Sequence, residues 1–159
     1  MKIFITGSKQ TGKSTCIQQV ISTLNLSCSG YLTLPYYKAG HRVGFMLHSL
    51  VPLQRNDLSF SIDKEGIPGV FNDFGVEILE HSNQGVLVLD EIGFLERNEK
   101  QYLEVLLNKI KTYPNILGAL RKTDLPYIQE IKAMQDVLVY DLDTMNRRDV
   151  FMDILKRIM

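Results

Sequence analysis

The sequence holds few of the residues that form metal centres and disulfide frameworks. Its 159 residues include no tryptophan, two cysteines (Cys16 and Cys28) and three histidines (His41, His48 and His81). These side chains lack the spacing of a zinc site, and two cysteines are too few for a disulfide scaffold. The composition therefore argues against both classes and favours a reducing, cytoplasmic location.

Net charge and long apolar runs are also absent. Lys plus Arg and Asp plus Glu both number 18, so the formal net charge is zero. This balance gives no overall attraction to nucleic acid or to an anionic membrane. No apolar run approaches the ~20 residues of a membrane span, and no signal peptide precedes the first apolar segment, so we expect no membrane partner. A solvated face explains the basic residues of the last predicted helix better than a nucleic-acid site does: Arg147, Arg148, Lys156 and Arg157.

What the sequence contains fits one α/β domain over residues 1–159. Apolar residues make up 45% and charged residues 23%, both ordinary for a soluble globular protein with a buried core. Strand patterns alternate with helical patterns, which predicts βαβ crossovers and a mostly parallel central sheet with helices on both faces. We expect a three-layer α/β fold and favour a monomer.

Apolar patterns place the predicted elements along the chain. The predicted strands cover residues 2–6, 30–37, 42–50, 85–90, 115–120 and 136–141. The predicted helices cover residues 13–24, 74–81, 96–111, 125–134 and 146–158. The tetrapeptide KAGH joins the second and third strands as an added β-hairpin, which we expect at one end of the sheet. Residues 51–74 carry prolines, glycines and charges, and no strand is predicted there.

The segment GSKQTGKS, residues 7–14, matches the phosphate-loop pattern G-x-x-x-x-G-K-[ST] between a predicted strand and a predicted helix. Backbone N–H groups of such a loop converge on phosphate oxygens, and the helix N-terminus adds its positive dipole end. Glycine lets the backbone bend and approach the phosphates closely. The residues predicted to bind a nucleotide are Gly7, Ser8, Lys9, Gln10, Thr11, Gly12, Lys13, Ser14 and Thr15.

Three side chains of this segment have predicted roles of their own. Lys13 would supply a cation to the β- and γ-phosphates, and Ser14 would place its hydroxyl on Mg²⁺. Thr15 would contact the α-phosphate. A nucleoside triphosphate and Mg²⁺ are therefore the predicted ligands, and the motif makes this a P-loop fold.

A second acidic motif follows a buried strand. GVLVLDE places Asp90 and Glu91 at the carboxyl end of that strand, the edge where ligands bind in open parallel sheets. Asp90 is predicted to complete the Mg²⁺ shell through water, as the corresponding aspartate does in P-loop enzymes. Glu91 is predicted to act as the general base that polarises the attacking water.

Phosphoryl transfer also needs positive charge on the transferring group, which arginine commonly supplies. The candidates are Arg42, Arg97, Arg121, Arg147 and Arg148, and spacing along the sequence does not choose among them.

The sequence resembles the cancer-related nucleoside-triphosphatase family. DEIGFLE, residues 90–96, is similar to the family motif D-E-I-G-x-M-E, with Leu95 in place of methionine. GYLTLPYYKAGHRVGF, residues 30–45, is similar to G-F-x-T-x-E-V-R-x-x-G-x-R-x-G-F, except for Pro35 and Tyr37 where the family has Glu and Arg. NRRD, residues 146–149, resembles the Asn-Arg pair that opens the last helix. The resemblance implies Mg²⁺-dependent hydrolysis of ATP, GTP and other nucleoside triphosphates to diphosphates, with loose preference for the base.

Two other functions stay open at this point. A nucleotide or small-molecule kinase would use the same phosphate loop, and Arg121 and Lys122 could belong to the lid that it needs. A nucleotide-dependent adaptor protein with slow turnover is the other alternative, because the family arginine is replaced by Tyr37.

Overall fold

An eight-stranded sheet organises the chain, whose computed structural model describes residues 1–54, 58–62 and 65–159. The order of the strands across the sheet is β5-β4-β3-β2-β6-β7-β1-β8. The strands are β1 (Lys2–Gly7), β2 (Cys28–Lys38), β3 (His41–Ser49), β4 (Leu58–Ile62), β5 (Glu65–Gly66), β6 (Val86–Ile92), β7 (Ile116–Arg121) and β8 (Val137–Asp141). The helices are α1 (Lys13–Leu24), a π-helical turn over Phe71–Gly75, α2 (Val76–Glu80), α3 (Lys100–Thr112), α4 (Pro126–Ala133) and α5 (Arg147–Ile158).

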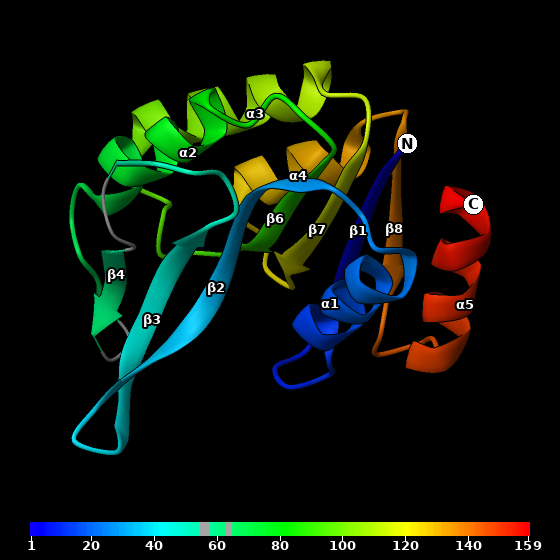
Figure 1. The fold of residues 1–159 in the computed structure, drawn as a ribbon, viewed down its shortest axis with the longest axis horizontal. Helices are drawn as coiled ribbons and strands as arrows, with labels where there is room; N and C mark the ends of the chain where they lie inside the picture. The colour runs from blue at the N-terminus through cyan, green and yellow to red at the C-terminus, as the bar shows by residue number, and fades with distance from the viewer. Residues whose placement is uncertain (55–57, 63–64) are drawn as a thin grey trace.

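Helices cover both faces of the parallel part of this sheet, as predicted. Strands β2, β6, β7, β1 and β8 run parallel to one another. Figure 1 shows α2, α3 and α4 over one face and α1 and α5 over the other. Along β1, Phe4 packs into the core under α3 and α4, whereas Ile3 and Ile5 pack toward α1 and α5. Both faces of β1 are therefore buried, which explains its continuous apolar sequence.

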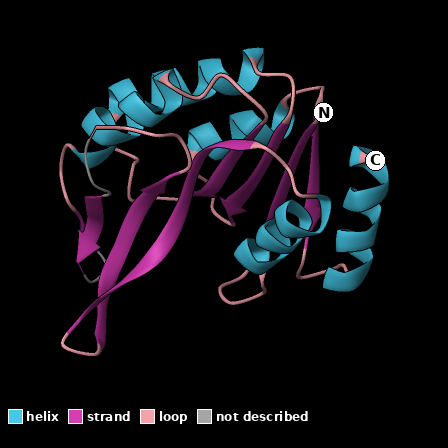
Figure 2. Cartoon of the chain, in the orientation of Figure 1, coloured by secondary structure: helices cyan, strands magenta, loops and turns pink. Residues whose placement is uncertain are grey.

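An antiparallel extension completes the sheet beside β2. The predicted hairpin is present: β2 and β3 pair antiparallel and are joined through Ala39 and Gly40, whose φ values are 52° and 81°. Strands β4 and β5 continue the antiparallel pairing beyond β3. They fall in the segment where no strand was predicted. Figure 2 shows β2 and β3 reaching well beyond the helices.

The position of β7 brings three strand ends together. β7 lies between β1 and β6, and it pairs parallel with both. Its last residue, Arg121, is in register with Gly7, and its Leu120 is in register with Ile92 of β6. The end of β1, where the phosphate loop begins, therefore lies beside the ends of β7 and β6.

Several predicted boundaries are wrong by two residues or more. The third helix begins at Lys100 instead of Glu96, because residues 93–99 form turns in which Arg97 and Glu99 donate to carbonyls three residues earlier. Helical structure before α2 begins at Phe71 instead of Phe74. The β6 strand continues to Ile92, so Asp90 and Glu91 lie inside the strand. Among the described residues, none of the helices has both the length and the apolar character that crossing a membrane requires.

Candidate active site

The predicted phosphate loop joins the end of β1 to the start of α1. β1 ends at Gly7 and α1 begins at Lys13. Gln10 and Gly12 have φ values of 60° and 91°, so the chain turns through left-handed conformations before it enters the helix. Gly12 is the N-cap of α1, and no side chain hydrogen-bonds there as a cap. The N–H groups of the first helical turn are thus oriented toward an incoming ligand, which favours an anion.

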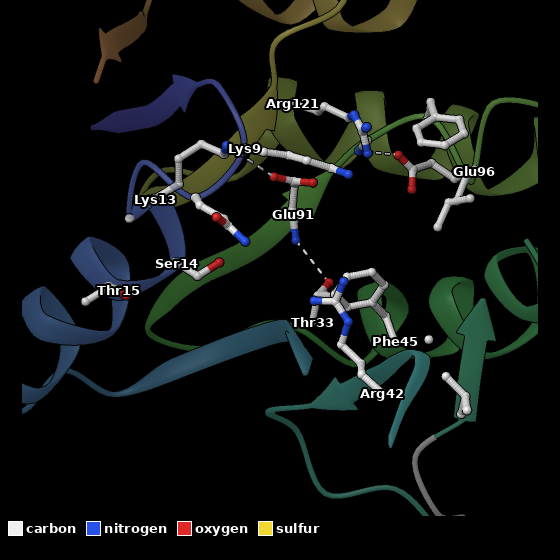
Figure 3. Close-up of a pocket in the computed structure, with 17 residues that line it drawn as sticks. Lys9, Lys13, Ser14, Thr15, Thr33, Arg42, Phe45, Glu91, Glu96 and Arg121 are labelled. Atoms are coloured by element: carbon white, nitrogen blue, oxygen red, sulfur yellow. Dashed lines mark hydrogen bonds and ion pairs between the residues drawn. The ribbon is translucent and has the colours of Figure 1, made fainter. Parts of the chain in front are cut away.

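Lys13 lies under this loop. It is 8% exposed, and its ammonium donates 3.0 Å hydrogen bonds to the carbonyl oxygens of Gly7 and Ser8. The same ammonium lies 3.8 Å from Oε2 of Glu91 (Figure 3). The two residues belong to sequence motifs far apart in the chain, and the fold makes them neighbours.

A second set of contacts fixes the start of the loop. Asp143 accepts hydrogen bonds from the backbone N–H of Ser8 at 3.0 Å and from its hydroxyl at 2.8 Å. Lys122 bridges Asp143 and Asp141 at 2.8 and 2.9 Å. The lysine contact and the Ser8 contacts hold the pKa of Asp143 well below its usual range. Lys122, a lid candidate for the kinase alternative, is therefore held in ion pairs with the last residue of β8 and with the loop that follows it.

Asp90 and Ser14 are in direct contact. The Ser14 hydroxyl donates a 2.7 Å hydrogen bond to Oδ1 of Asp90. Oδ2 of Asp90 is buried and has no hydrogen-bond partner among the described residues. Burial raises the pKa of Asp90 to about 6, although the Ser14 hydrogen bond opposes the shift. A buried carboxylate oxygen that lacks a partner, beside a hydroxyl, fits a hard divalent cation such as Mg²⁺.

Protein side chains alone would not complete the shell of such an ion. The described residues include no group of three or more His, Cys, Asp and Glu side chains that could hold a metal ion. Mg²⁺ commonly keeps several waters and uses substrate phosphates with one or two protein ligands. The pair Ser14 and Asp90 fits that mode of binding.

Glu91 is held through its backbone and presents its carboxylate to a cavity. Its N–H donates a 3.2 Å hydrogen bond to Oγ1 of Thr33, and its carbonyl accepts a 3.4 Å hydrogen bond from the Tyr31 hydroxyl. Burial raises the pKa of Glu91, whereas the charges of Lys13 and Arg121 lower it. A partly buried carboxylate whose pKa is raised binds a proton more readily than an exposed carboxylate does.

The cavity has a volume of about 770 Å³ and joins the phosphate loop to the hairpin. It is lined by the loop and α1 residues Lys9, Gln10, Gly12, Lys13, Ser14 and Thr15. On the opposite side it is lined by Thr33, Arg42, Val43, Gly44, Phe45, Glu91, Gly93, Phe94, Leu95, Glu96 and Arg121. Of the predicted nucleotide-binding residues, Gly7, Ser8 and Thr11 lie in the loop but not on the cavity wall.

Two of the five candidate arginines line this cavity. Arg42 enters from β3, and its guanidinium lies 5.1 Å from the centre of the Phe45 ring. Arg121 enters from the end of β7, and its guanidinium lies 4.4 Å from the centre of the Phe94 ring. Figure 3 shows Glu91 between these arginines and the phosphate-loop residues.

The other three arginines lie outside the cavity lining. Arg97 is exposed and donates a 2.8 Å hydrogen bond to the carbonyl of Phe94. Arg147 packs against Gly12, so closely that a Cβ on that glycine would lie 2.5 Å from Nη1. Arg148 is exposed on α5.

Glu96 is a site residue that the sequence interpretation missed. It is 2% exposed, and burial raises its pKa to about 8. Its carboxylate accepts a hydrogen bond from the N–H of Gly93, and the Tyr127 hydroxyl donates to the carbonyl of the same glycine. These contacts fix the turn after β6. The sequence feature that could have identified Glu96 is its place as the last residue of the motif DEIGFLE. We had assigned this glutamate to the first turn of a helix.

A comparison with protein families identifies the family of the chain. The model of a family described as NTPase matches residues 2–155. The chain belongs to this NTPase family. The predicted family is confirmed, and with it the class of activity, hydrolysis of nucleoside triphosphates.

Relatives of this NTPase come from bacteria, archaea and mammals. The chain is 29% identical to nucleoside-triphosphatase THEP1 of Thermotoga sp. strain RQ2, over 98% of the chain and 94% of the relative. It is 28% identical to nucleoside-triphosphatase THEP1 of Methanocaldococcus jannaschii, over 100% of the chain and 98% of the relative. It is 24% identical to the cancer-related nucleoside-triphosphatase homolog of Bos taurus, over 96% and 94%.

Two solved structures share the fold of this NTPase. The crystal structure of THEP1 from Aquifex aeolicus has a TM-score of 0.76 and 22% identity, over 99% of this chain and 98% of that one. The solution structure of a human cancer-related nucleoside triphosphatase has a TM-score of 0.73 and 21% identity, over 99% and 97%. The predicted α/β fold class is thereby confirmed.

Proposed function

We propose that this NTPase is a Mg²⁺-dependent enzyme that hydrolyses ATP, GTP and other nucleoside triphosphates to the diphosphate and phosphate. The contact between Ser14 and Asp90 is the observation that carries the proposal, because it joins the phosphate loop to the acidic end of β6. The enzyme would act as one P-loop domain over residues 1–159, as a cytoplasmic monomer without membrane or nucleic-acid partners. Two core clusters packed on opposite faces of one sheet support the single domain.

Residues of the phosphate loop would hold the substrate. Backbone N–H groups of the loop and the first turn of α1 would bind the phosphate oxygens, and Thr15 would contact the α-phosphate. In the structure, the Lys13 ammonium donates hydrogen bonds to two loop carbonyls and lies near Glu91. When a triphosphate binds, the ammonium would turn to the β- and γ-phosphates. Its burial beside the loop supports this role, because a short movement brings it to a bound anion.

Ser14 and Asp90 would hold Mg²⁺, the hydroxyl directly and the carboxylate through water. When bound, the ion neutralises charge on the β- and γ-phosphates. The buried Oδ2 of Asp90 supports this assignment, since a carboxylate oxygen in that position needs a hydrogen-bond donor or a cation.

Glu91 would act as the general base. Its carboxylate would accept a proton from water while the water oxygen attacks the γ-phosphorus. The bond between that phosphorus and the bridging oxygen would break, and the diphosphate would leave with the electron pair. The partial burial of Glu91 and the raised pKa that follows support this role.

Phosphate release from ATP, GTP, CTP and UTP, with and without Mg²⁺, tests the proposal. We expect release from all four with Mg²⁺ and none without it. Glu91→Gln should keep nucleotide binding and lose about 10²–10⁴-fold in kcat, while Glu104→Gln, an exposed position on α3, should match the wild type. Unchanged turnover in Glu91→Gln would contradict the base assignment. Turnover that depends on an added phosphoryl acceptor would support a kinase. Turnover that depends on a partner protein would support an adaptor.

A further inference from the structure

Arg121 occupies a central position at the ligand-binding edge of the sheet. It is the last residue of β7, the strand between the phosphate-loop strand β1 and the Asp90–Glu91 strand β6. Its register partner on β1 is Gly7, the first residue of the phosphate loop. Because parallel strands present their carboxyl ends at one edge, the Arg121 side chain begins between the phosphate loop and Glu91.

Three functional side chains converge beside Gly93. From the position that a Cβ on Gly93 would occupy, Oε1 of Glu91 is 3.5 Å away, Cδ of Arg121 is 3.7 Å away and Oε1 of Glu96 is 3.8 Å away. The side chain of Arg121 therefore reaches the same space as both carboxyls, and its charge also lowers the pKa of Glu96. Figure 3 shows Arg121 directed into the cavity beside Glu91 and Glu96.

The guanidinium of Arg121 packs against an aromatic ring, and its positive charge is not neutralised by a carboxylate of the described residues. It lies 4.4 Å from the centre of the Phe94 ring, a cation–π contact that restricts its position. It makes no ion pair with any of the described residues. Glu96 does not neutralise it at pH 7, because burial raises the pKa of that carboxyl to about 8.

We infer that Arg121 is the catalytic cation that binds the transferring γ-phosphoryl group, supplied within the same chain as the phosphate loop and Glu91. This inference rests on the proposed function. Charge spreads over the equatorial oxygens of the phosphoryl group as the bond to the diphosphate breaks. A guanidinium presents a planar fork of N–H donors that matches two of these oxygens, whereas an ammonium presents a point charge.

The other arginines fit this role less well. Arg97 rests on the same Phe94 ring, at 5.3 Å, but donates to the backbone and does not line the cavity. Arg147 packs on Gly12 but does not line the cavity. Arg42 lines the cavity from the hairpin, with its guanidinium on the Phe45 ring, and is not among the three side chains that meet beside Gly93.

Steady-state kinetics of Arg121→Ala, Arg121→Lys and the matched control Arg97→Ala test the inference. We expect Arg121→Ala to lose about 10³-fold or more in kcat with KM changed only a few-fold, because the contact forms in the transition state. Arg121→Lys should recover only a small part of the loss. Arg97→Ala, which removes a guanidinium from the same ring, should stay within about twofold of the wild type.

Binding of a transition-state mimic separates catalysis from folding. Arg121→Ala should bind the nucleoside diphosphate like the wild type but lose tight binding of the diphosphate with aluminium fluoride. If Arg121→Ala does not fold, Arg121→Lys decides through the same two measurements.

Three results would overturn the inference. They are a kcat of Arg121→Ala within threefold of the wild type, an equal loss in diphosphate binding and in kcat, and a large kcat loss confined to Arg42→Ala. A wild-type protein that hydrolyses no nucleoside triphosphate would instead refute the proposed function, so the two failures are distinguishable.

Discussion

The Ser14 hydroxyl donates a 2.7 Å hydrogen bond to Asp90, so the phosphate loop and the acidic end of β6 touch directly. Between the two residues in the chain lie strands β2 to β5 and the helical segments before β6. Their contact depends on the sheet order, in which only β7 lies between β1 and β6. A hydroxyl and a buried carboxylate at this distance are arranged for one shared ligand.

The Ser14–Asp90 pair predicts a metal-dependence phenotype. Asp90→Asn should still accept the Ser14 hydrogen bond but lack the negative charge. We expect the apparent affinity for Mg²⁺ or the turnover to fall by about 10–100-fold. Ser14→Ala should lower the same quantities. Titration of Mg²⁺ at saturating triphosphate measures the change, with Asp124→Asn, an exposed position after β7, as the control. An unchanged Mg²⁺ midpoint in both variants would show that this pair does not hold the ion.

Removal of the Lys13 ammonium should weaken triphosphate binding. Lys13→Ala deletes charge-assisted hydrogen bonds of about 2–3 kcal/mol, which corresponds to a loss of about 30–150-fold in affinity. A fluorescent triphosphate analogue in equilibrium titration reports the dissociation constant. Lys38→Ala, on the exposed end of β2, should bind like the wild type. Equal affinity of Lys13→Ala and Lys38→Ala would remove Lys13 from the phosphate site.

The buried Glu96 predicts a stability change with pH. Its pKa is raised from 4.5 to about 8, so the folded state binds the proton more tightly than the unfolded state does. This contribution to the free energy of unfolding is full below pH 4.5 and is lost as pH rises to about 8. Glu96→Gln stays neutral and should escape the loss, which is on the order of 3–5 kcal/mol.

Urea unfolding at pH 5 and pH 8.5 measures this effect. From about pH 5 to about pH 8.5, the free energy of unfolding should fall less in Glu96→Gln than in the wild type. In the exposed control Glu104→Gln it should fall as much as in the wild type. Parallel pH dependence of the wild type and Glu96→Gln would mean that Glu96 is ionised in the folded protein at neutral pH.

Two glycines in left-handed conformations predict a contrast in stability. Gly30 has φ +89°, and a Cβ there would overlap the Val88 carbonyl of the neighbouring strand. Gly40 has φ +81° in the hairpin turn, with nothing within 4 Å of such a Cβ. Gly30→Ala should cost at least about 3 kcal/mol and Gly40→Ala about 1–2 kcal/mol. Equal unfolding midpoints in urea would contradict the overlap.

Local patterns in the sequence predicted the parts of the fold that local forces define. The bounds of α1 are those predicted, because a glycine precedes Lys13 and apolar residues recur at helical spacing from there. The parallel strands and the hairpin were also found, since burial on two faces and a turn tetrapeptide leave local signals. Strands β4 and β5 left no such signal, because their pairing depends on β3.

Tertiary contacts explain where the sequence interpretation failed. Glu96 fits the first turn of a helix by composition, but its carboxylate turns inward to the N–H of Gly93. The start of the helix therefore moves to Lys100. A hydrogen bond of this kind depends on the turn after β6 and on Tyr127 from α4, and neither is encoded in local periodicity.

The sequence by itself determined the ligand class and two halves of a site. GSKQTGKS specifies a phosphate-binding backbone, and LDE specifies carboxylates at a strand end, because each motif works through its own neighbours in the chain. Only the tertiary structure decided that Ser14 touches Asp90, and that of five arginines Arg121 lies beside Glu91. Those relationships depend on strand order and register, which arise when the whole sheet packs between its two helix layers.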